Sequence, residues 1–390
     1  MRLHYLDNLK SIALILGLFF HVAITYADGV GYTVKSEELS FLYTVFVHFI
    51  HVFRMPVFFF LSGYFTALTL EKKGEIFFLR SRFSRIVVPA LLGISLFAPV
   101  ESYLQFVQRV GEFSYINFFP YFFTGEFFLL SHLWFLYYLL LFSIIYLIIK
   151  SANLNRIAIQ DSIPSLLETK LFFKVESVPY TLWTFVTLFL VNLLFTKEDS
   201  FLSLSPFHFF YYSVFFIVGT RIYTKRILDL ILPKYNELLH RSLWAAFSFG
   251  VYLYLEEIDP YWMGIRFEPI PILYRIIHIF LESSLAWNLI IITCSLAKNY
   301  LQFQNKFTSF FSESGMCIYL IHHPISLLLG FMFLQIELNM HLKSLVQLFL
   351  VITLSYLFYI IISKFKITRM VFGMKITKDE ELITKKILST

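Results

Sequence analysis

The sequence predicts an all-α protein, a polytopic transmembrane helical bundle of about ten helices with both termini in the cytoplasm. Of its 390 residues, 58% are hydrophobic and 15% charged, and the mean hydropathy is +0.71, which is too apolar for a soluble domain. Apolar runs of roughly 20 residues, long enough to cross a bilayer, recur along the chain. Twenty-five Lys and Arg residues fall in segments on the same side of the membrane as the N-terminus, and five fall on the opposite side. This asymmetry sets the orientation.

Charged and Pro- or Gly-rich breaks divide the apolar sequence into ten predicted spans. These lie near residues 7–27, 41–70, 86–104, 132–150, 179–195, 206–224, 241–256, 272–297, 315–336 and 342–363. The second is too long for one straight crossing, and Pro56 removes a backbone donor from it, so a kink or break is expected there. The aromatic stretch 113–130 is interrupted by Pro120, Gly125 and Glu126, so we interpret it as interfacial or re-entrant.

These spans make residues 1–363 one membrane-embedded domain, followed by a short basic cytoplasmic tail, residues 364–390. The loop asymmetry accounts for the net charge of +6, so the predicted partner is the lipid bilayer of the cytoplasmic (inner) membrane and not nucleic acid. Nothing in the sequence sets an oligomeric state.

The first span carries a cation and an imidazole on one face. His21 follows Lys10 by eleven positions, which corresponds to about three helical turns and ~16 Å. Lys10 would lie at the membrane surface below an imidazole deep in the bilayer. Ionisable groups at that depth commonly mark a functional site.

The second span contains polar residues in an otherwise apolar run. His48, His51 and Arg54 recur at i, i+3 and i+6, and Ser62 returns to the same side, so we interpret them as one polar stripe. Other intramembrane candidates are His132, His322, His323, Arg275, His278 and Glu282. A pocket of imidazoles and guanidiniums can transfer protons, although each side chain could equally serve as an interhelical hydrogen-bonding group. No metal site is predicted, because His48 and His51 lack a metal-binding frame.

A basic pair follows the second span. Arg82 and Arg85 lie three residues apart at the predicted cytoplasmic surface, where paired guanidiniums can clamp phosphate oxygens. The sequence has no Gly-rich phosphate loop, so a nucleotide would be held by side chains.

Several of these segments together resemble the acyltransferase 3 family of polytopic membrane acyltransferases. The matching stretches are LDNLKSIALILGLFFH, FIHVFRMPVFFFLSGYF, RSRFSRIVVP, SHLWFL, FFIVG and IYLIHHPI. The family's Arg-x10-His motif corresponds to Lys10 and His21, its Arg-x-x-Arg motif to Arg82 and Arg85, and its Leu-x-His-x-Pro element to His322. Lys10 keeps the charge of the family's Arg but lacks its bidentate fork.

The resemblance implies an O-acyltransferase that moves an acyl group from cytoplasmic acyl-CoA to a hydroxyl of a periplasmic or cell-surface glucan or other carbohydrate. The donor would be succinyl-CoA or acetyl-CoA, with its phosphates near Lys10, Arg82 and Arg85. His21 would be the catalytic residue, as a general base or as an acylated nucleophile. Arg54, His51 and His322, and less directly His132, are the candidates to stabilise the oxyanion or orient His21.

A transporter is the alternative that the residues leave open. A proton-coupled transporter or flippase could use His21, His51 and Glu282 as a proton relay. It would not require the basic pair Arg82 and Arg85 at the cytoplasmic mouth.

Overall fold

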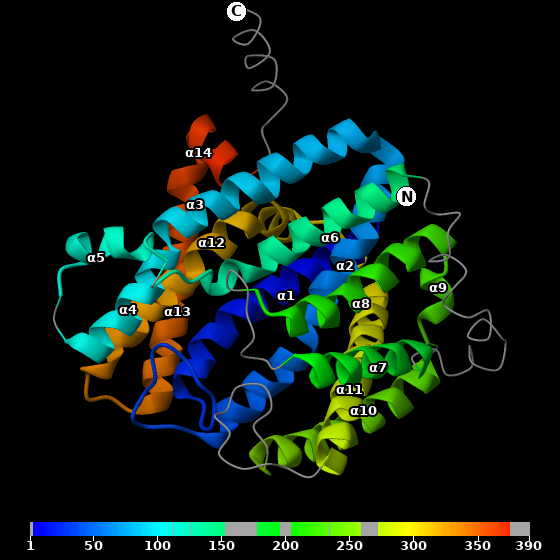
Figure 1. The fold of residues 1–390 in the computed structure, drawn as a ribbon, viewed down its shortest axis with the longest axis horizontal. Coiled ribbons are helices and arrows are strands. Elements are labelled where there is room, and N and C mark those ends of the chain that lie inside the picture. The colour runs from blue at the N-terminus through cyan, green and yellow to red at the C-terminus, as the bar shows by residue number, and fades with distance from the viewer. Residues whose placement is uncertain are drawn as a thin grey trace, which may run out of the picture.

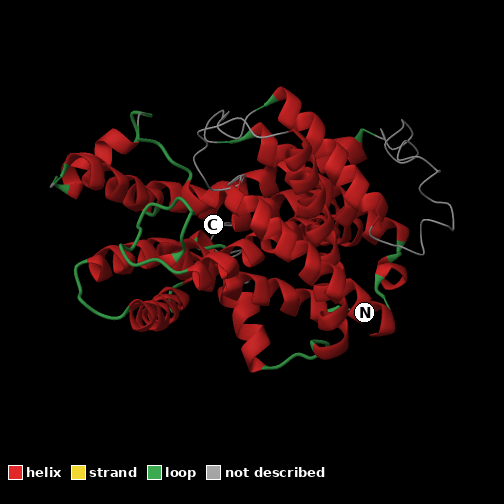
Figure 2. Ribbon diagram, turned by 90° about the horizontal axis from the view of Figure 1, so that it is seen from below, coloured by secondary structure: helices red, strands yellow, loops and turns green. Residues whose placement is uncertain are grey.

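The computed structural model describes residues 3–111, 113–125, 127–152, 178–195, 204–233, 235–258 and 272–374. Within these ranges the chain consists of helices and loops, with an isolated bridge between Ala27 and Ser40 (Figure 2). The predicted all-α class is confirmed.

Helices occupy all ten predicted spans, although the third is divided. The long helices are α1 (His4–Ala23), α2 (Phe41–Arg82), α6 (Trp134–Ser151), α7 (Val178–Leu194), α8 (Pro206–Lys225), α10 (Tyr235–Ile258), α11 (Ile272–Tyr300), α12 (Lys306–Leu334) and α13 (Met340–Ser363). Six segments of the described chain are long and apolar enough to cross a membrane by length and composition. The structure is therefore a helical membrane bundle, while ten crossings and cytoplasmic termini stay predictions.

Helix α1 lies in the middle of the bundle, where it packs against α2, α11, α12 and α13 (Figure 1). Its buried residues include Leu6, Ala13 and Phe20, and the short 3-10 helix η1 (Ile24–Tyr26) continues it. This central position surrounds His21 with neighbouring helices.

Helices α2 and α8 pack at backbone distance. A Cβ added to Gly63 would lie 2.0 Å from the Phe216 carbonyl oxygen, and one added to Gly219 would lie 2.1 Å from the Phe60 carbonyl oxygen. Small residues permit such close approach between membrane helices. The FFFLSGYF and FFIVG stretches are thus two sides of one contact, which fixes α2 relative to the rest of the bundle.

The interruption in α2 lies at Gly74 and not at Pro56. Gly74 is the position inside α2 with non-helical dihedral angles (φ 76°, ψ 174°), whereas the helix continues through Pro56. The helix is therefore not broken at Pro56, since membrane helices tolerate a missing backbone donor when neighbours pack around it, and a kink there stays a prediction. Gly74 adopts a positive φ that lets the chain turn and run across one end of the bundle (Figure 1).

The segment after this turn passes through a π-helical stretch, η2 (Phe83–Val87), and then through two short helices. These are α3 (Val88–Leu96) and α4 (Ala98–Val110), which meet at Phe97. The predicted single span over 86–104 is therefore two helices. The short α5 (Tyr115–Phe122) occupies part of the stretch predicted to be interfacial or re-entrant.

A loop, residues 27–40, closes the opposite end of the bundle. The Ser36 amide donates to the Thr25 carbonyl (2.9 Å), and Lys35 Nζ donates to the carbonyl oxygens of Ile24 (3.1 Å) and Ala27. Burial lowers the pKa of Lys35 to about 8, and the nearby Asp28 carboxylate partly opposes this shift. The loop is thus tied to the end of α1, near His21.

The beginning of the predicted tail packs onto the bundle. After α14 (Lys366–Val371), Phe372 and Met374 are buried in the main core. The rest of the tail predicted at 364–390, from residue 375 on, lies outside the described residues, and the division into domain and tail stays a prediction.

Candidate active site

Four histidines from three separate segments meet near the C-terminal end of α1. His21 comes from α1, His132 from the 3-10 helix η3 (Ser131–Leu133), and His322 and His323 from α12. The His21 ring centroid lies 4.4 Å from that of His323, 5.3 Å from His322 and 6.5 Å from His132. We call these four residues the His21 cluster. His132, His322 and His323 are 2–8% exposed and His21 is half-buried.

Hydroxyl groups connect the rings. The Tyr32 hydroxyl lies 3.1 Å from His323 Nε2 and 3.4 Å from His21 Nδ1. The Ser131 hydroxyl lies 3.3 Å from His323 Nδ1 and 3.2 Å from His132 Nδ1. These contacts join His21, His323 and His132 into one continuous network.

Backbone carbonyl groups hold two of the rings. His132 Nε2 lies 2.9 Å from the Tyr319 carbonyl oxygen, and His322 Nδ1 lies 2.9 Å from the Ile318 carbonyl oxygen. The Tyr319 hydroxyl in turn donates to the His132 carbonyl oxygen (2.5 Å). Each ring nitrogen that faces a carbonyl oxygen must carry a hydrogen, so these contacts fix the tautomers of neutral His132 and His322.

One buried carboxylate lies next to the cluster. Glu101 Oε2 is 3.9 Å from His323 Nδ1, and Oε1 accepts a hydrogen bond from Thr33 (2.8 Å). Tyr32 and Thr33 are consecutive, so the loop 27–40 contacts both the histidines and this carboxylate. The negative charge is placed where it can stabilise a positively charged imidazole.

Arg54 lies against α1 one turn from His21. Its Nη1 is 3.0 Å from the position that a Cβ on Gly17 would occupy, and its guanidinium carbon is 4.6 Å from the centre of the Phe20 ring. The side chain is 9% exposed, and no carboxylate within 4.0 Å pairs with it in the described part of the chain. A buried guanidinium in this position is available to an anion.

His51 lies beside Arg54, but His48 does not. The His51 ring stacks at 6.1 Å on Phe20, next to Arg54, whereas the His48 ring faces Tyr252 of α10 at 6.2 Å. The predicted single stripe through His48, His51 and Arg54 is wrong, because six residues at about 100° each leave His48 and Arg54 about 120° apart around the helix axis. Helix α2 therefore contributes to two separate polar regions.

The second region is a buried contact between a carboxylate of α10 and an imidazole of α11. His278 Nε2 lies 2.7 Å from Glu256 Oε2, and the two side chains are 3% and 4% exposed. The Tyr252 ring lies 4.8 Å from the His278 ring. We call His48, Tyr252, Glu256 and His278 the His278 cluster.

Lys10, Arg82 and Arg85 gather at the N-terminal end of α1. Both arginines lie within electrostatic range of Lys10 and of each other. Arg82 is held by a hydrogen bond from Nη2 to the Thr66 hydroxyl (2.6 Å) and by its position 4.8 Å above the Phe78 ring, while Arg85 is exposed. The structure thus brings together the three predicted anion-binding residues.

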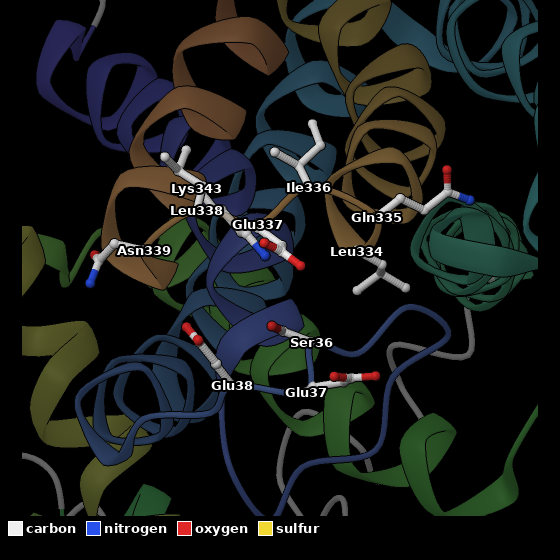
Figure 3. A pocket seen from close by; sticks show the side chains of 10 residues that line it. All are labelled: Ser36, Glu37, Glu38, Leu334, Gln335, Ile336, Glu337, Leu338, Asn339 and Lys343. Atoms are coloured by element: carbon white, nitrogen blue, oxygen red, sulfur yellow. The ribbon is translucent and has the colours of Figure 1, made fainter.

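A cavity of about 600 Å³ opens at the other end of the bundle, between the loop 27–40 and the turn that joins α12 to α13 (Figure 3). Its polar lining consists of Ser36, Glu37, Glu38, Gln335, Glu337, Asn339 and Lys343. The cavity and the His21 cluster share the loop that carries Tyr32. Side chains of this kind can hydrogen-bond to hydroxyl groups.

Several residues of the site were not predicted. Tyr32 lies in the loop 27–40, Ser131 begins η3 and Glu101 lies in α4. Polar residues are ordinary in such short segments, so they give no signal in the sequence. Ser131 has a φ of 54°, which a non-glycine residue rarely adopts and which only the folded backbone reveals. The sequence indicates His323 only as a further intramembrane candidate and His132 as a less direct one, yet both contact the centre of the network.

The arrangement suits acid–base or nucleophilic chemistry by imidazole. It combines several imidazoles that can be neutral, a nearby carboxylate, and the buried Arg54 cation, which has no carboxylate partner among the described residues. Within the described ranges, no group of three or more His, Cys, Asp or Glu residues forms a metal site.

Comparison with known proteins identifies the family. The acyltransferase 3 family, described as an acyltransferase domain, matches residues 3–364. Glucans biosynthesis protein C of Escherichia coli O139:H28 (strain E24377A / ETEC) is 26% identical over 346 residues, covering 84% of this chain and 83% of the relative. The protein of the same name from Escherichia coli (strain K12) gives the same values. No solved structure matches the chain. The apolar helices and the bacterial relatives place it in the inner membrane. The chain belongs to the acyltransferase 3 family and is a multi-pass membrane acyltransferase.

Proposed function

We propose that this acyltransferase moves a succinyl or acetyl group from cytoplasmic acyl-CoA to a hydroxyl of a glucan or another carbohydrate at the outer face of the membrane. The observation that carries the proposal is the position of His21. It lies between a basic end with Lys10, Arg82 and Arg85 and a polar end with the 600 Å³ cavity. The glucan as acceptor follows from the name of the relatives.

Each end of α1 suits one substrate. With both termini in the cytoplasm, the basic end would face acyl-CoA, whose phosphates the arginine pair can bind. The ~16 Å from Lys10 to His21 is comparable with the length of a pantetheine arm, so the thioester would reach the histidines. The acceptor would approach through the end that the loop 27–40 closes.

The transfer conserves atoms and protons. His21 removes the hydroxyl proton of the acceptor while the oxygen attacks the thioester carbonyl carbon; a C–O bond forms and the C–S bond breaks. The proton passes from His21 to the departing CoA sulfur. The same residue could instead accept the acyl group and pass it on, and both routes require an unprotonated His21 nitrogen.

Arg54 is the residue we expect to determine the acyl group. Its buried guanidinium, with no carboxylate partner among the described residues, suits the free carboxylate of a succinyl group, which an acetyl group lacks. Arg54→Met should therefore reduce succinyl transfer more than acetyl transfer. Equal losses with both donors would assign Arg54 to the oxyanion instead.

The test is transfer of radiolabel from succinyl-CoA or acetyl-CoA to a glucan fraction in membranes that carry the protein. His21→Ala should lower the transfer by about 1000-fold, within the range of general acid–base catalysis. His341→Ala is the matched control, because His341 is exposed and lies outside the cluster. Label in the glucan that persists in folded His21→Ala would contradict the assignment of His21. No label from either donor with the wild-type chain would contradict the proposed substrates.

A further inference from the structure

The hydrogen-bond partners along His21, Tyr32, His323, Ser131 and His132 determine the direction of the five hydrogen bonds that join them to the Tyr319 carbonyl group. The starting point is the Tyr319 carbonyl oxygen, which can only accept. His132 Nε2, 2.9 Å away, must donate to it, so His132 Nδ1 in the neutral ring must accept. Its partner is the Ser131 hydroxyl at 3.2 Å, which therefore donates to His132.

The same logic continues toward His21. Because the Ser131 hydrogen is used, its oxygen accepts from His323 Nδ1 at 3.3 Å. His323 Nε2 then carries no hydrogen and accepts from the Tyr32 hydroxyl at 3.1 Å. The Tyr32 oxygen is left to accept from His21 Nδ1 at 3.4 Å. Five hydrogen bonds thus point one way, from His21 to the Tyr319 carbonyl group.

We propose that this directional chain holds His21 in the tautomer with hydrogen on Nδ1 and keeps Nε2 free as the nitrogen that acts on the substrate. Tyr32, His323, Ser131 and His132 are positioning residues, because they act through His21. The inference rests on the proposed function only for the identity of the reaction.

Two further observations support the chain. Burial, with a smaller contribution from the nearby Glu101 charge, raises the pKa of Tyr32 well above its ordinary value, so the phenol keeps the hydrogen that it donates. Ser131 has a φ of 54°, a costly conformation for a residue with a Cβ, and this conformation places its hydroxyl between two imidazoles.

The chain also favours the positive form of His21. When His21 takes the acceptor's proton on Nε2, its Nδ1–H becomes a stronger donor to Tyr32, and aligned hydrogen bonds strengthen one another. The Glu101 carboxylate, 3.9 Å from His323, adds a favourable charge. The protons in the five aligned hydrogen bonds stay on their donor atoms. The transferred proton goes from the acceptor hydroxyl through His21 Nε2 to the CoA sulfur.

The direct test is the ¹⁵N NMR spectrum of ring-labelled histidine in the full-length protein in lipid, with the His21 signals assigned by their loss in His21→Ala. The two neutral tautomers have distinct nitrogen shifts. We expect hydrogen on His21 Nδ1 in the wild type and a mixture of tautomers in Tyr32→Phe. Hydrogen on Nε2 in the wild type would overturn the inference. This readout does not depend on substrate, so it stands apart from any failure of the proposed function.

The kinetic test uses Tyr32→Phe, Ser131→Ala and their combination. Each single variant should lower kcat by about 10- to 100-fold with KM for acyl-CoA nearly unchanged. The double variant should have a kcat close to that of the less active single variant, because either substitution alone already interrupts the row of aligned hydrogen bonds. The control is Tyr26→Phe, which removes another buried hydroxyl, 2.9 Å from Gln347 Oε1 and outside the chain. Fully multiplicative losses, a change confined to KM, or an equal loss in Tyr26→Phe would contradict the chain.

Discussion

The His21 cluster and the His278 cluster are both buried and both contain histidine, but their charges are balanced differently. His278 pairs with Glu256 at 2.7 Å. In the His21 cluster, the nearest carboxylate is 3.9 Å from an imidazole, and the neighbouring Arg54 has no carboxylate partner in the part of the chain that the structure describes. A buried carboxylate in direct contact with an imidazole holds helices together, whereas a cation with no carboxylate at hand is available to a substrate.

The largest effect that we expect in this comparison follows from removing His278. His278→Ala removes the imidazole that lies 2.7 Å from the buried Glu256 carboxylate, and removing one member of a buried pair costs about 3–5 kcal/mol in the free energy of unfolding. The measurement is thermal or denaturant unfolding in detergent, together with acyl transfer per folded molecule. We expect lower stability and transfer within a few-fold of the wild type.

A loss of transfer in the folded His278→Ala protein would show that the His278 cluster takes part in the reaction. The variant Glu256→Gln with His278→Gln replaces both the carboxylate and the imidazole with amides and should recover part of the stability, since uncharged groups of similar size need no counter-charge.

The second prediction concerns the packing that both clusters share. Helix α2 carries Arg54 and His48, and its contact with α8 at Gly63 and Gly219 sets the position of both. Gly219→Ala would force a methyl group against the Phe60 carbonyl, which is backbone and cannot move aside. We expect a loss of about 1–3 kcal/mol in unfolding free energy, and lower transfer.

Gly250→Ala on α10 is the matched control, because an added Cβ there meets nothing within 4 Å. It should be neutral or slightly stabilising. An unfolding free energy of Gly219→Ala equal to that of the wild type would contradict the close contact between α2 and α8.

A third prediction tests the basic end of α1. Arg82→Ala combined with Arg85→Ala should raise KM for acyl-CoA by about 10- to 100-fold with a small change in kcat, because each charge-assisted hydrogen bond to phosphate contributes on the order of 1.5–3 kcal/mol before solvent screening. Arg80→Ala, an exposed arginine of the same segment, is the control. A fall in kcat alone would place the pair outside the donor site.

The smallest expected effect is the pH dependence of the loop 27–40. Lys35 has a pKa of about 8 in the fold, below its ordinary 10.5, so the folded chain binds this proton less tightly than the unfolded chain. Stability of the closed loop should therefore rise with pH between about 8 and 10.5, and be lowest below that window.

Hydrogen exchange at the Ser36 amide, corrected for its intrinsic rate, reports this opening because that amide donates to Thr25. Lys35→Met should remove the pH dependence. An opening equilibrium that is the same at about pH 7.5 and pH 9.5 in the wild type would contradict it.

The sequence by itself determined where the helices lie and which residue types enter the membrane. Apolar run length fixes a span, and His21, Arg54 and His322 are conspicuous because polar side chains are costly there. The basic residues Lys10, Arg82 and Arg85 were visible by the same reasoning.

Only the tertiary structure decided which polar groups meet. The helical period sets the direction of a side chain from its own axis but not which neighbour fills that direction, so His48 and Arg54 were assigned to one face and lie on two. Tyr32, Ser131 and Glu101 reach the histidines from segments far apart in the chain. Their contacts depend on how α1, α4, α12 and the loop 27–40 pack, a long-range arrangement that no local pattern in the sequence records.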